Sequence, residues 1–191
     1  MMPAQLLALR EVLPVRMVRV WGHARGEAAA FCRRLHGRLP GIVLEPVGSV
    51  RACVERADVV VTITPSRRPL VWRAWLAPGT HVNAVGADAP GKQELEARIL
   101  REACVVVDDR AQATHGGELN VPVRRGEYHP RAIHASLGEI IIKRRAGRRD
   151  HKQLTVFDST GLAIHDVALG AAIVRLATRR HLGRRLQFFL P

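Results

Sequence analysis

The chain has 191 residues, of which 47% are hydrophobic, so its length and composition suit one globular domain with at most a small appendage. No apolar run approaches the ~20 residues of a membrane span, and no secretory signal pattern opens the chain, so we expect a cytoplasmic protein that does not enter membranes. The net charge of +13 comes almost entirely from arginine, because only three of the 30 basic residues are lysines. No nucleic-acid-binding motif accompanies this charge and aromatic residues make up 4%, so the arginines are interpreted as solvated and a nucleic-acid partner is not expected.

Cysteine and histidine spacing argues against a metal site or a disulfide framework. The three cysteines, Cys32, Cys53 and Cys104, form no CxxC pair and stand among apolar neighbours. His36 follows Cys32 at a spacing that places both on one helix face, but a pair of residues does not make a metal site. Buried free thiols and no metal are therefore predicted.

Short β-branched runs alternate along the chain with amphipathic segments. Strands are predicted at residues 16–21, 42–44, 58–63, 80–85, 104–108 and 153–157. Helices or helical turns are predicted at residues 6–13, 28–35, 49–56, 72–76, 93–101, 134–144 and 163–179, with a loop at 114–117. Crossovers of this length suit parallel strands, so the pattern predicts an α/β fold with helices on both faces of a parallel sheet. A further strand signal at 186–190 has no obvious partner.

Four segments carry a family resemblance. They are ADVVVTITPSRRPLV (57–71), GTHVNAVGADAPGKQELEARIL (79–100), the VVVDD to GGEL stretch (105–119) and LTVFDSTGLAIHDVALGAAIV (154–174). In this order they resemble the ornithine cyclodeaminase / mu-crystallin family. The resemblance implies a Rossmann-type nicotinamide-binding domain, a small amino or imino acid as substrate, and a homodimer in full-length relatives.

The resemblance also implies that part of such a protein is missing. Residues 1–161 would be a partial Rossmann domain, and residues 162–191 would return to an N-terminal substrate and dimerisation domain that precedes Met1. The G-x-G-x-x-G loop that lets a backbone approach a pyrophosphate is absent, as is the strand before it. Without that strand, the edges near 18–21 and 59–63 would be unpaired, at roughly 1–3 kcal/mol for each unsatisfied buried group. A start assigned too late, a gene remnant and a short protein that pairs these edges with another chain all remain open.

Asp88 is the predicted catalytic residue. It matches the acid that cyclodeaminase-like members place beside the α-carbon and amino group of the substrate, so it would also bind substrate. A carboxylate there can hold an ammonium group and relay protons during imine chemistry. The alternative is a loop aspartate that accepts backbone N–H bonds. Lys92 resembles a cofactor-contacting lysine, and the alternative is a solvated side chain.

Further residues are expected at the cofactor by the same resemblance. Asn83, Ala84 and Val85 would end a strand under the nicotinamide, and Thr62 would lie near a ribose. Ser159 would close on the nicotinamide and Thr160 on the substrate. For all of these the alternative is turn and cap chemistry.

A second group of residues concerns the choice of cofactor. His23 and Arg25 follow the strand at 16–21, where no acid is available for a ribose 2′-hydroxyl, so they suit a 2′-phosphate and favour NADP over NAD. A plain arginine in a βα turn is the alternative. Because the phosphate loop is absent, binding of NAD(P) by this chain is expected to be weak.

The predicted function is NAD(P)-dependent hydride transfer at the α-carbon of an amino or imino acid. The protein would be a cyclodeaminase, an amino-acid dehydrogenase or a cyclic imine reductase, impaired in this truncated chain. The alternative is a non-catalytic small-ligand-binding or oligomer-partner protein of the mu-crystallin type.

Overall fold

The computed structural model describes residues 2–184 and 186, and the chain divides into two compact units, Met1–Thr160 and Gly161–Pro191. The helices of the first unit are α1 (Met2–Val12), α2 (Glu27–Leu35), α3 (Val50–Val54), α4 (Ala97–Glu102), α5 (Arg110–His115), α6 (Asn120–Arg124) and α7 (Leu137–Ile141), with the 3-10 turns η1 (Arg73–Trp75) and η2 (Pro130–Ala132). Its strands are β1 (Met17–Val20), β2 (Val43–Pro46), β3 (Val59–Thr62), β4 (Arg67–Val71), β5 (His81–Ala84), β6 (Gln93–Leu95), β7 (Cys104–Val107), β8 (Ala135–Ser136) and β9 (Thr155–Asp158).

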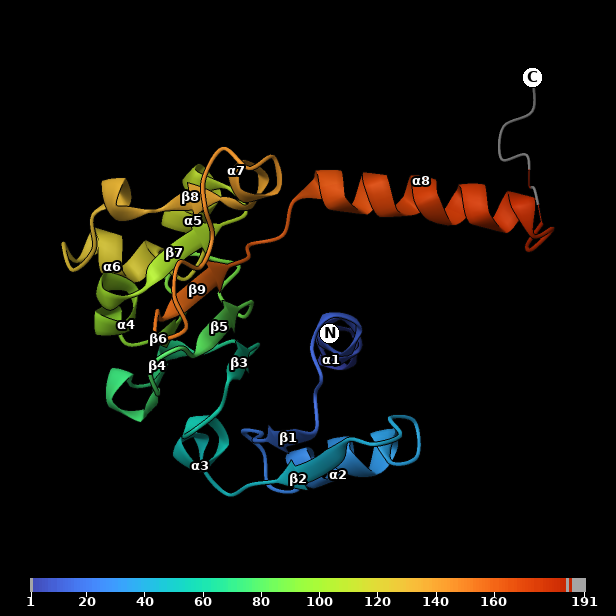
Figure 1. The fold of residues 1–191 in the computed structure, drawn as a ribbon, viewed down its shortest axis with the longest axis horizontal. Coiled ribbons are helices and arrows are strands. Elements are labelled where there is room, and N and C mark those ends of the chain that lie inside the picture. Colours follow the sequence, from blue (N-terminus) through green and yellow to red (C-terminus); the bar gives the residue numbers. More distant parts are fainter. Residues whose placement is uncertain (1, 185, 187–191) are drawn as a thin grey trace. The chain divides into compact units, whose positions relative to one another are not determined.

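The main sheet has five parallel strands in the order β3-β5-β9-β7-β8, which confirms the predicted α/β fold (Figure 1). The last strand in the sequence, β9, lies between β5 and β7. Val82, Val105 and Val156 are almost completely buried here, as continuous β-branched runs predict for strands covered on both faces. The carboxyl ends of all five strands therefore meet at one edge, where open α/β sheets present their ligand-binding groups.

Three predicted elements need correction. Residues 93–101 do not form one helix: Gln93–Leu95 is strand β6, paired in parallel with β4, and α4 begins at Ala97. The segment 114–117 is not all loop, because α5 extends to His115. Residues 134–144 contain a two-residue strand, β8, before the short helix α7, which Ser136 and Glu139 close with a capping box. In each case, hydrogen bonds to another segment or to a capping side chain outweigh the secondary structure that the local sequence pattern predicts.

The strand predicted at 16–21 lies outside the main sheet. Strand β1 pairs in parallel with β2 alone, which makes a separate two-stranded sheet. Leu6, Leu35 and Leu39 form a small buried cluster beside it. Its link to the rest of the unit is made at α3, where the Arg19 guanidinium donates to the Ala52 carbonyl at 2.7 Å and the Cys53 thiol donates to the Arg19 carbonyl at 3.2 Å.

The predicted unpaired edges are confirmed for the described residues. Strand β3 is the last strand on its side of the five-stranded sheet, and its Asp58 and Thr62 carbonyls accept bonds from His81 and Val85. The alternate residues Val59 and Val61 therefore present their backbone groups away from β5. A cavity of about 750 Å³ lies on this side, lined by α1, by β1 and by β3. The free edges of β1 and β3 thus border one largely apolar cavity.

The second unit consists of one long helix, α8 (Ala163–Arg179), with the predicted bounds. It has no buried residue, and six of its large apolar side chains are exposed: Ile164, Val167, Leu169, Ile173, Val174 and Leu176. Of the strand expected at 186–190, residues 187–190 lie outside the described residues. Within the part of the chain that the structure describes, no helix is long and apolar enough to cross a membrane.

Candidate functional site

The ends of three neighbouring strands bring several predicted site residues together. Thr62, Ala84 and Asp158 stand in register across β3, β5 and β9. The pairing continues one residue further, because the Val85 N–H donates to the Thr62 carbonyl and the Ser159 N–H donates to the Ala84 carbonyl, both at 2.9 Å. The Thr62 hydroxyl is buried and has no hydrogen-bond partner among the described residues. The sheet thus places this free hydroxyl at the edge where a ligand is expected.

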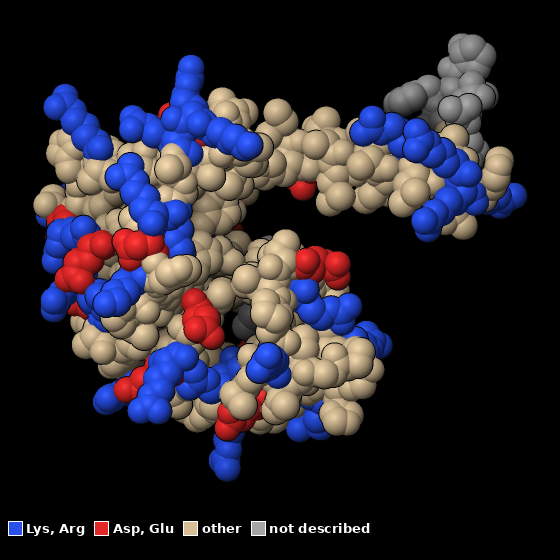
Figure 2. Space-filling model, viewed as in Figure 1, with Lys and Arg blue, Asp and Glu red and all other residues tan. Residues whose placement is uncertain are grey.

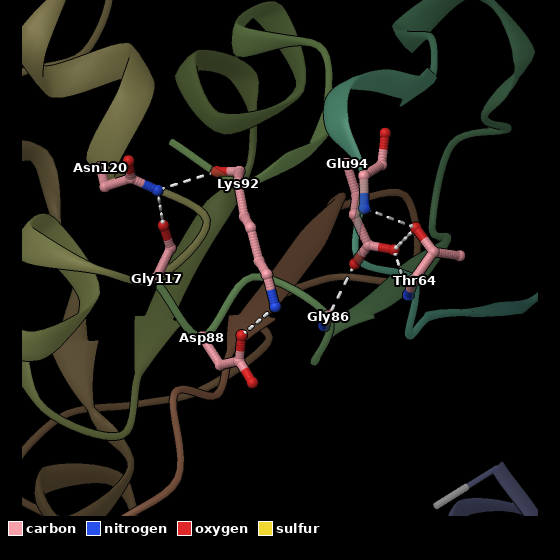
Figure 3. Close-up of polar contacts among 8 residues, drawn as sticks. Thr64, Gly86, Asp88, Lys92, Glu94, Gly117 and Asn120 are labelled. Carbon is pink, nitrogen blue, oxygen red and sulfur yellow. Dashed lines mark hydrogen bonds and ion pairs between the residues drawn. The ribbon is translucent and has the colours of Figure 1, made fainter. Parts of the chain in front are cut away.

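Asp88 and Lys92 lie in the loop between β5 and β6, and their side chains form an ion pair (Figure 3). The Asp88 side chain is 54% exposed and the Lys92 side chain 21% exposed, so the acid faces solvent while the lysine is largely covered. The hydrogen bond from Lys92 lowers the pKa of Asp88 below its ordinary value. The carboxylate is therefore ionised at neutral pH, in the form that can bind an ammonium group or accept a proton.

Glu94 holds the start of this loop, although the sequence analysis gave it no role. Its carboxylate is completely buried and accepts hydrogen bonds from the Thr64 N–H and hydroxyl at 2.7 Å and from the Gly86 N–H at 3.1 Å. Gly86 has to be glycine here, because a Cβ atom would stand 2.4 Å from both the Glu94 carboxylate and the Thr64 carbonyl. One buried side chain thus ties the loops after β3 and β5 together.

Asn120 holds the end of the same loop from the first turn of α6 (Figure 3). Its Oδ1 accepts the Gly91 N–H at 2.8 Å, while its Nδ2 donates to the Lys92 carbonyl at 2.8 Å and to the Gly117 carbonyl at 2.5 Å. Gly91 has a φ of +83°, a conformation that favours glycine. All three contacts agree with one orientation of the amide, so the loop is clamped by a side chain that follows Lys92 by 28 residues.

Two more buried carboxylates lie behind the loop. Glu118 accepts the Leu95 N–H at 2.6 Å and the Glu94 N–H at 2.9 Å, and burial raises its pKa well above the ordinary value. Asp158, at the end of β9, accepts the Glu118 N–H at 3.1 Å. Burial is the largest cause that raises the pKa of Asp158 to about 7, and the nearby charge of Asp108 also raises it. Where β6, α6 and β9 approach one another, backbone N–H groups therefore donate to buried carboxylates instead of to backbone carbonyls.

The segment after β9 is anchored on Asp108, which follows β7. The Thr160 N–H donates to Asp108 at 2.7 Å, its hydroxyl donates at 3.0 Å, and the Ser159 hydroxyl lies 3.4 Å from the same carboxylate. Both hydroxyls predicted to face cofactor or substrate therefore already have an intramolecular partner. A ligand would have to share or displace these bonds.

Asn83 is directed along β5 rather than beyond its end. Its Oδ1 lies 2.9 Å from Nε2 of His81, whose other ring nitrogen lies 2.7 Å from the Thr155 hydroxyl. Burial lowers the pKa of His81, so the ring is neutral at neutral pH. Any contribution of Asn83 to a cofactor at the strand end would then come from its backbone.

His23 and Arg25 are exposed in the turn after β1 and therefore belong to the two-stranded sheet. The His23 ring packs edge-on against Trp21 at 6.2 Å. The same turn contains an acid, because the Glu27 carboxylate accepts the Ala24 N–H at 3.2 Å. Residues 21–25 contain no acid, as expected, but Glu27, two residues later, reaches back to this turn.

Charge on the rest of the surface is mixed, and no metal centre is visible. Figure 2 shows basic side chains over many elements of the first unit, with acidic side chains between them on the face drawn. Within residues 2–184 and 186, no group of three or more histidine, cysteine, aspartate or glutamate side chains is placed to hold a metal ion.

Comparisons with known proteins agree with the geometry. The sequence profile of the ornithine cyclodeaminase/mu-crystallin family matches residues 1–179. An alanine dehydrogenase of Archaeoglobus fulgidus is 42% identical over 97% of this chain and 56% of its own length. An archaeal alanine dehydrogenase dimer with bound NAD superimposes with a TM-score of 0.89, at 42% identity and over 57% of that chain. The Δ1-pyrroline-2-carboxylate reductase of Thermococcus litoralis, in complex with NADH and L-proline, superimposes with a TM-score of 0.90, at 29% identity over 95% of this chain and 56% of that chain.

These relatives carry enzyme names, which gives the alternative of a non-catalytic binding protein no support. The chain spans about 56% of the length of the relatives that it matches. The family match and the parallel sheet both rest on nearly the whole chain. The chain belongs to the ornithine cyclodeaminase/mu-crystallin family.

Proposed function

We propose that this chain supplies the nicotinamide-binding part of an enzyme that moves a hydride to or from the α-carbon of an amino or imino acid. The observation that carries the proposal is the ionised Asp88, paired with Lys92 in a loop at the carboxyl edge of the parallel sheet. Relatives named as an alanine dehydrogenase and a pyrroline-carboxylate reductase support this class of reaction. Because the chain spans about 56% of their length, activity of the whole protein requires polypeptide that these residues do not provide.

Asp88 has the chemistry of a proton-relaying group. Its exposed, ionised carboxylate can bind a substrate ammonium group and take a proton as the amine becomes an imine. Lys92 neutralises the carboxylate until a substrate ammonium group replaces the lysine as its partner. A bound nicotinamide would supply or accept the hydride.

The chain offers contacts for the nicotinamide end of the cofactor but lacks the usual anchor for its pyrophosphate. The unpartnered Thr62 hydroxyl and the end of β5 offer polar contacts at the sheet edge. A glycine-rich loop at the N-terminus of a helix, the usual pyrophosphate anchor, is absent from the sequence. We therefore propose that the chain alone binds NAD(P) weakly, and that a sub-micromolar dissociation constant for NADPH in a fluorescence titration would contradict this.

The preference between NADP and NAD depends on the turn after β1. Exposed Arg25 suits a 2′-phosphate, whereas Glu27, two residues later, suits a 2′-hydroxyl. We propose NADP, because Glu27 already accepts a backbone bond inside the turn and Arg25 extends into solvent. The solved relatives described above contain NAD or NADH, so this chain would differ from them in its cofactor.

The second unit is proposed to pack on further polypeptide. Helix α8 exposes six large apolar side chains, more than a solvated helix needs, and this pattern is typical of a helix covered by a partner surface. A return to a substrate and dimerisation domain, within a homodimer like the archaeal relative, is the assembly that we propose.

The test is to supply the part of a relative's length that this chain does not cover. The portion of the Archaeoglobus fulgidus alanine dehydrogenase that this chain does not match would be joined to this chain or mixed with it. The assay follows reduced nicotinamide with L-alanine and with Δ1-pyrroline-2-carboxylate as substrates, and the added portion alone is the control. Turnover only when both parts are present is expected. A properly folded combination that binds NAD(P)H and turns over neither substrate class contradicts the proposal.

A further inference from the structure

The loop that carries Asp88 and Lys92 is held at both ends by side chains outside it. The tip, residues 88–90, has no backbone partner in a neighbouring strand, since the loop runs from the end of β5 to the start of β6. Its own structure is one turn, closed by the Lys92 N–H donating to the Ala89 carbonyl at 3.2 Å. A single turn of this kind does not fix the separation of two side chains, so the order of the Asp88–Lys92 pair has to come from its anchors.

The two anchors differ in what they hold. Glu94 fixes the second residue of the loop, Gly86, and also accepts bonds from Thr64. Asn120 fixes the last two, Gly91 and Lys92, and it bonds the backbone of the lysine in the ion pair. Of the two, Asn120 therefore fixes the backbone position from which the Lys92 side chain extends toward Asp88.

The amide of Asn120 suits this task for a chemical reason. It is 5% exposed, and it accepts one bond and donates two, so neither an aspartate nor a leucine of similar size can reproduce all three. Its third bond, to the Gly117 carbonyl, ties the loop to the turn before α6. Gly117 is packed so closely that a Cβ atom there would stand 2.7 Å from the Asp158 carboxylate. The anchor is thus rigid on its own side.

We infer that Asn120 is a positioning residue, which sets the Asp88–Lys92 ion pair by holding the backbone of Gly91 and Lys92. The catalytic consequence rests on the function proposed above, but the geometric statement does not. Asn120 makes its contacts through the loop backbone, so its effect on any reaction passes through the pair. Loss of the amide releases the loop end, lengthens the mean distance between the two charges and returns Asp88 toward its ordinary pKa.

Two measurements on the full chain report on the Asp88–Lys92 ion pair and require neither cofactor nor turnover. The first is the pKa of Asp88, followed by carbon NMR of its carboxyl group. The second is the rate at which a small amine-modifying reagent labels Lys92, followed by mass spectrometry. Lys143 and Lys152 are the only other lysines, so they serve as internal references in the same sample.

The variants are Asn120→Leu, which keeps the volume, and Asn120→Asp, which keeps only the bond to Gly91. Thr80→Val is the matched control. It deletes one equally buried side-chain bond, from Thr80 to the Ala57 carbonyl at 3.0 Å, before the amino end of β5. Any general loosening of the fold should appear in the control as well.

The expected result is a higher Asp88 pKa and a two- to fivefold faster labelling of Lys92 in both Asn120 variants, which is about what a partly exposed ion pair contributes. Lys143, Lys152 and the Thr80→Val protein should be unchanged in both measurements. Unchanged Asp88 and Lys92 in a folded Asn120 variant, or the same change in Thr80→Val, would overturn the inference.

If neither variant folds, hydrogen exchange of the parent chain tests the inference instead. The Gly91 amide should then be protected from hydrogen exchange at least as well as the Lys92 amide, which has a partner within the loop. Exchange of Gly91 as fast as an exposed loop amide would overturn the inference. Should the pair respond to Asn120 while Asp88→Asn leaves turnover of the restored enzyme unchanged, the positioning role stands and the proposed function fails.

Discussion

The five-stranded sheet and the two-stranded β1–β2 sheet are built from the same kind of β-branched sequence but differ in how their backbones are satisfied. In the larger sheet, β5, β7 and β9 have a partner on each side, and the buried Glu94 accepts the N–H groups of Thr64 and Gly86 beyond the ends of β3 and β5. In the smaller sheet, β1 has one partner and borders a cavity of about 750 Å³. The comparison teaches that a buried strand signal predicts a strand, but not how many partners that strand has among the described residues.

The largest expected effect concerns Asp88, in the loop at the carboxyl edge of the five-stranded sheet. In the enzyme restored with the unmatched portion of the Archaeoglobus relative, Asp88→Asn should lower kcat by roughly 10²–10⁴, because a general acid–base group typically contributes that much. Cofactor affinity should change little, since the substitution keeps the shape of the loop. Steady-state kinetics and a cofactor titration measure both quantities. Turnover within a few-fold of the parent would reduce Asp88 to a turn residue.

The next effect belongs to the free edges. The amides of Val59 and Val61 point away from β5, so they should exchange with solvent on the order of a hundredfold faster than the neighbouring paired amides of Val60 and Thr62. Addition of the unmatched portion of the relative should remove the alternation if it pairs with β3. Hydrogen exchange resolved by NMR measures each amide, with Val156 of the central strand β9 as the protected reference. Equal protection along β3 in the isolated chain would contradict the comparison.

The third effect is a pH dependence of the buried acids. Burial raises the pKa of Asp158 from 3.8 to about 7. Between these values the folded chain keeps a proton that the unfolded chain has lost, so the free energy of unfolding falls as pH rises from about 4 to about 7. The loss attributable to this group over that range is on the order of 3 kcal/mol.

Asp158→Asn checks the assignment of that slope. The amide oxygen can still accept the Glu118 N–H, and the variant carries no charge to bury. Thermal unfolding followed from pH 5 to pH 8 should therefore show a flatter profile than the parent. Glu118, whose pKa is also raised, should retain the remaining slope. An unaltered profile would show that Asp158 titrates normally in the folded chain.

The smallest effect concerns the turn after β1. Arg25→Ala should weaken NADPH binding to the restored enzyme roughly tenfold and leave NADH binding unchanged, because only the former presents a 2′-phosphate. Glu27→Gln is the matched variant in the same turn, and it should improve NADPH binding if the acid opposes the phosphate. Equal affinities for both cofactors in the parent enzyme would exclude the proposed preference for NADP.

Much of the fold could be predicted because its signals are local. The strands at 58–63 and 104–108 contain continuous β-branched runs, and those at 80–85 and 153–157 are short segments rich in β-branched and apolar residues, so all four are predicted from local sequence. The helix expected at about 163–179, from the capping segment before it and its apolar spacing, agrees with α8. Asp88 and Lys92 could be found from the family loop, and their spacing in one turn already permits contact.

Other features were decided by contacts between distant segments. Residues 93–95 form a strand because they pair with β4, and Glu118, more than twenty residues later, accepts the backbone N–H groups of Glu94 and Leu95. The roles of Glu94 and Asn120 were missed for the same reason, although each stands beside a leucine, in KQEL and in GGELN, and a polar residue at such a position was a signal that could have found them.

The sequence by itself determined the family, the parallel α/β class and the loop with the Asp88–Lys92 pair, because these depend on short stretches and on the order of segments. Only the tertiary structure decided that β9 enters the middle of the sheet and that buried carboxylates join β6, α6 and β9. It also decided that Asn120 clamps the loop from 28 residues away. The physical reason is that a buried donor or acceptor must find a partner at close range, and which one it finds depends on how the whole backbone is packed.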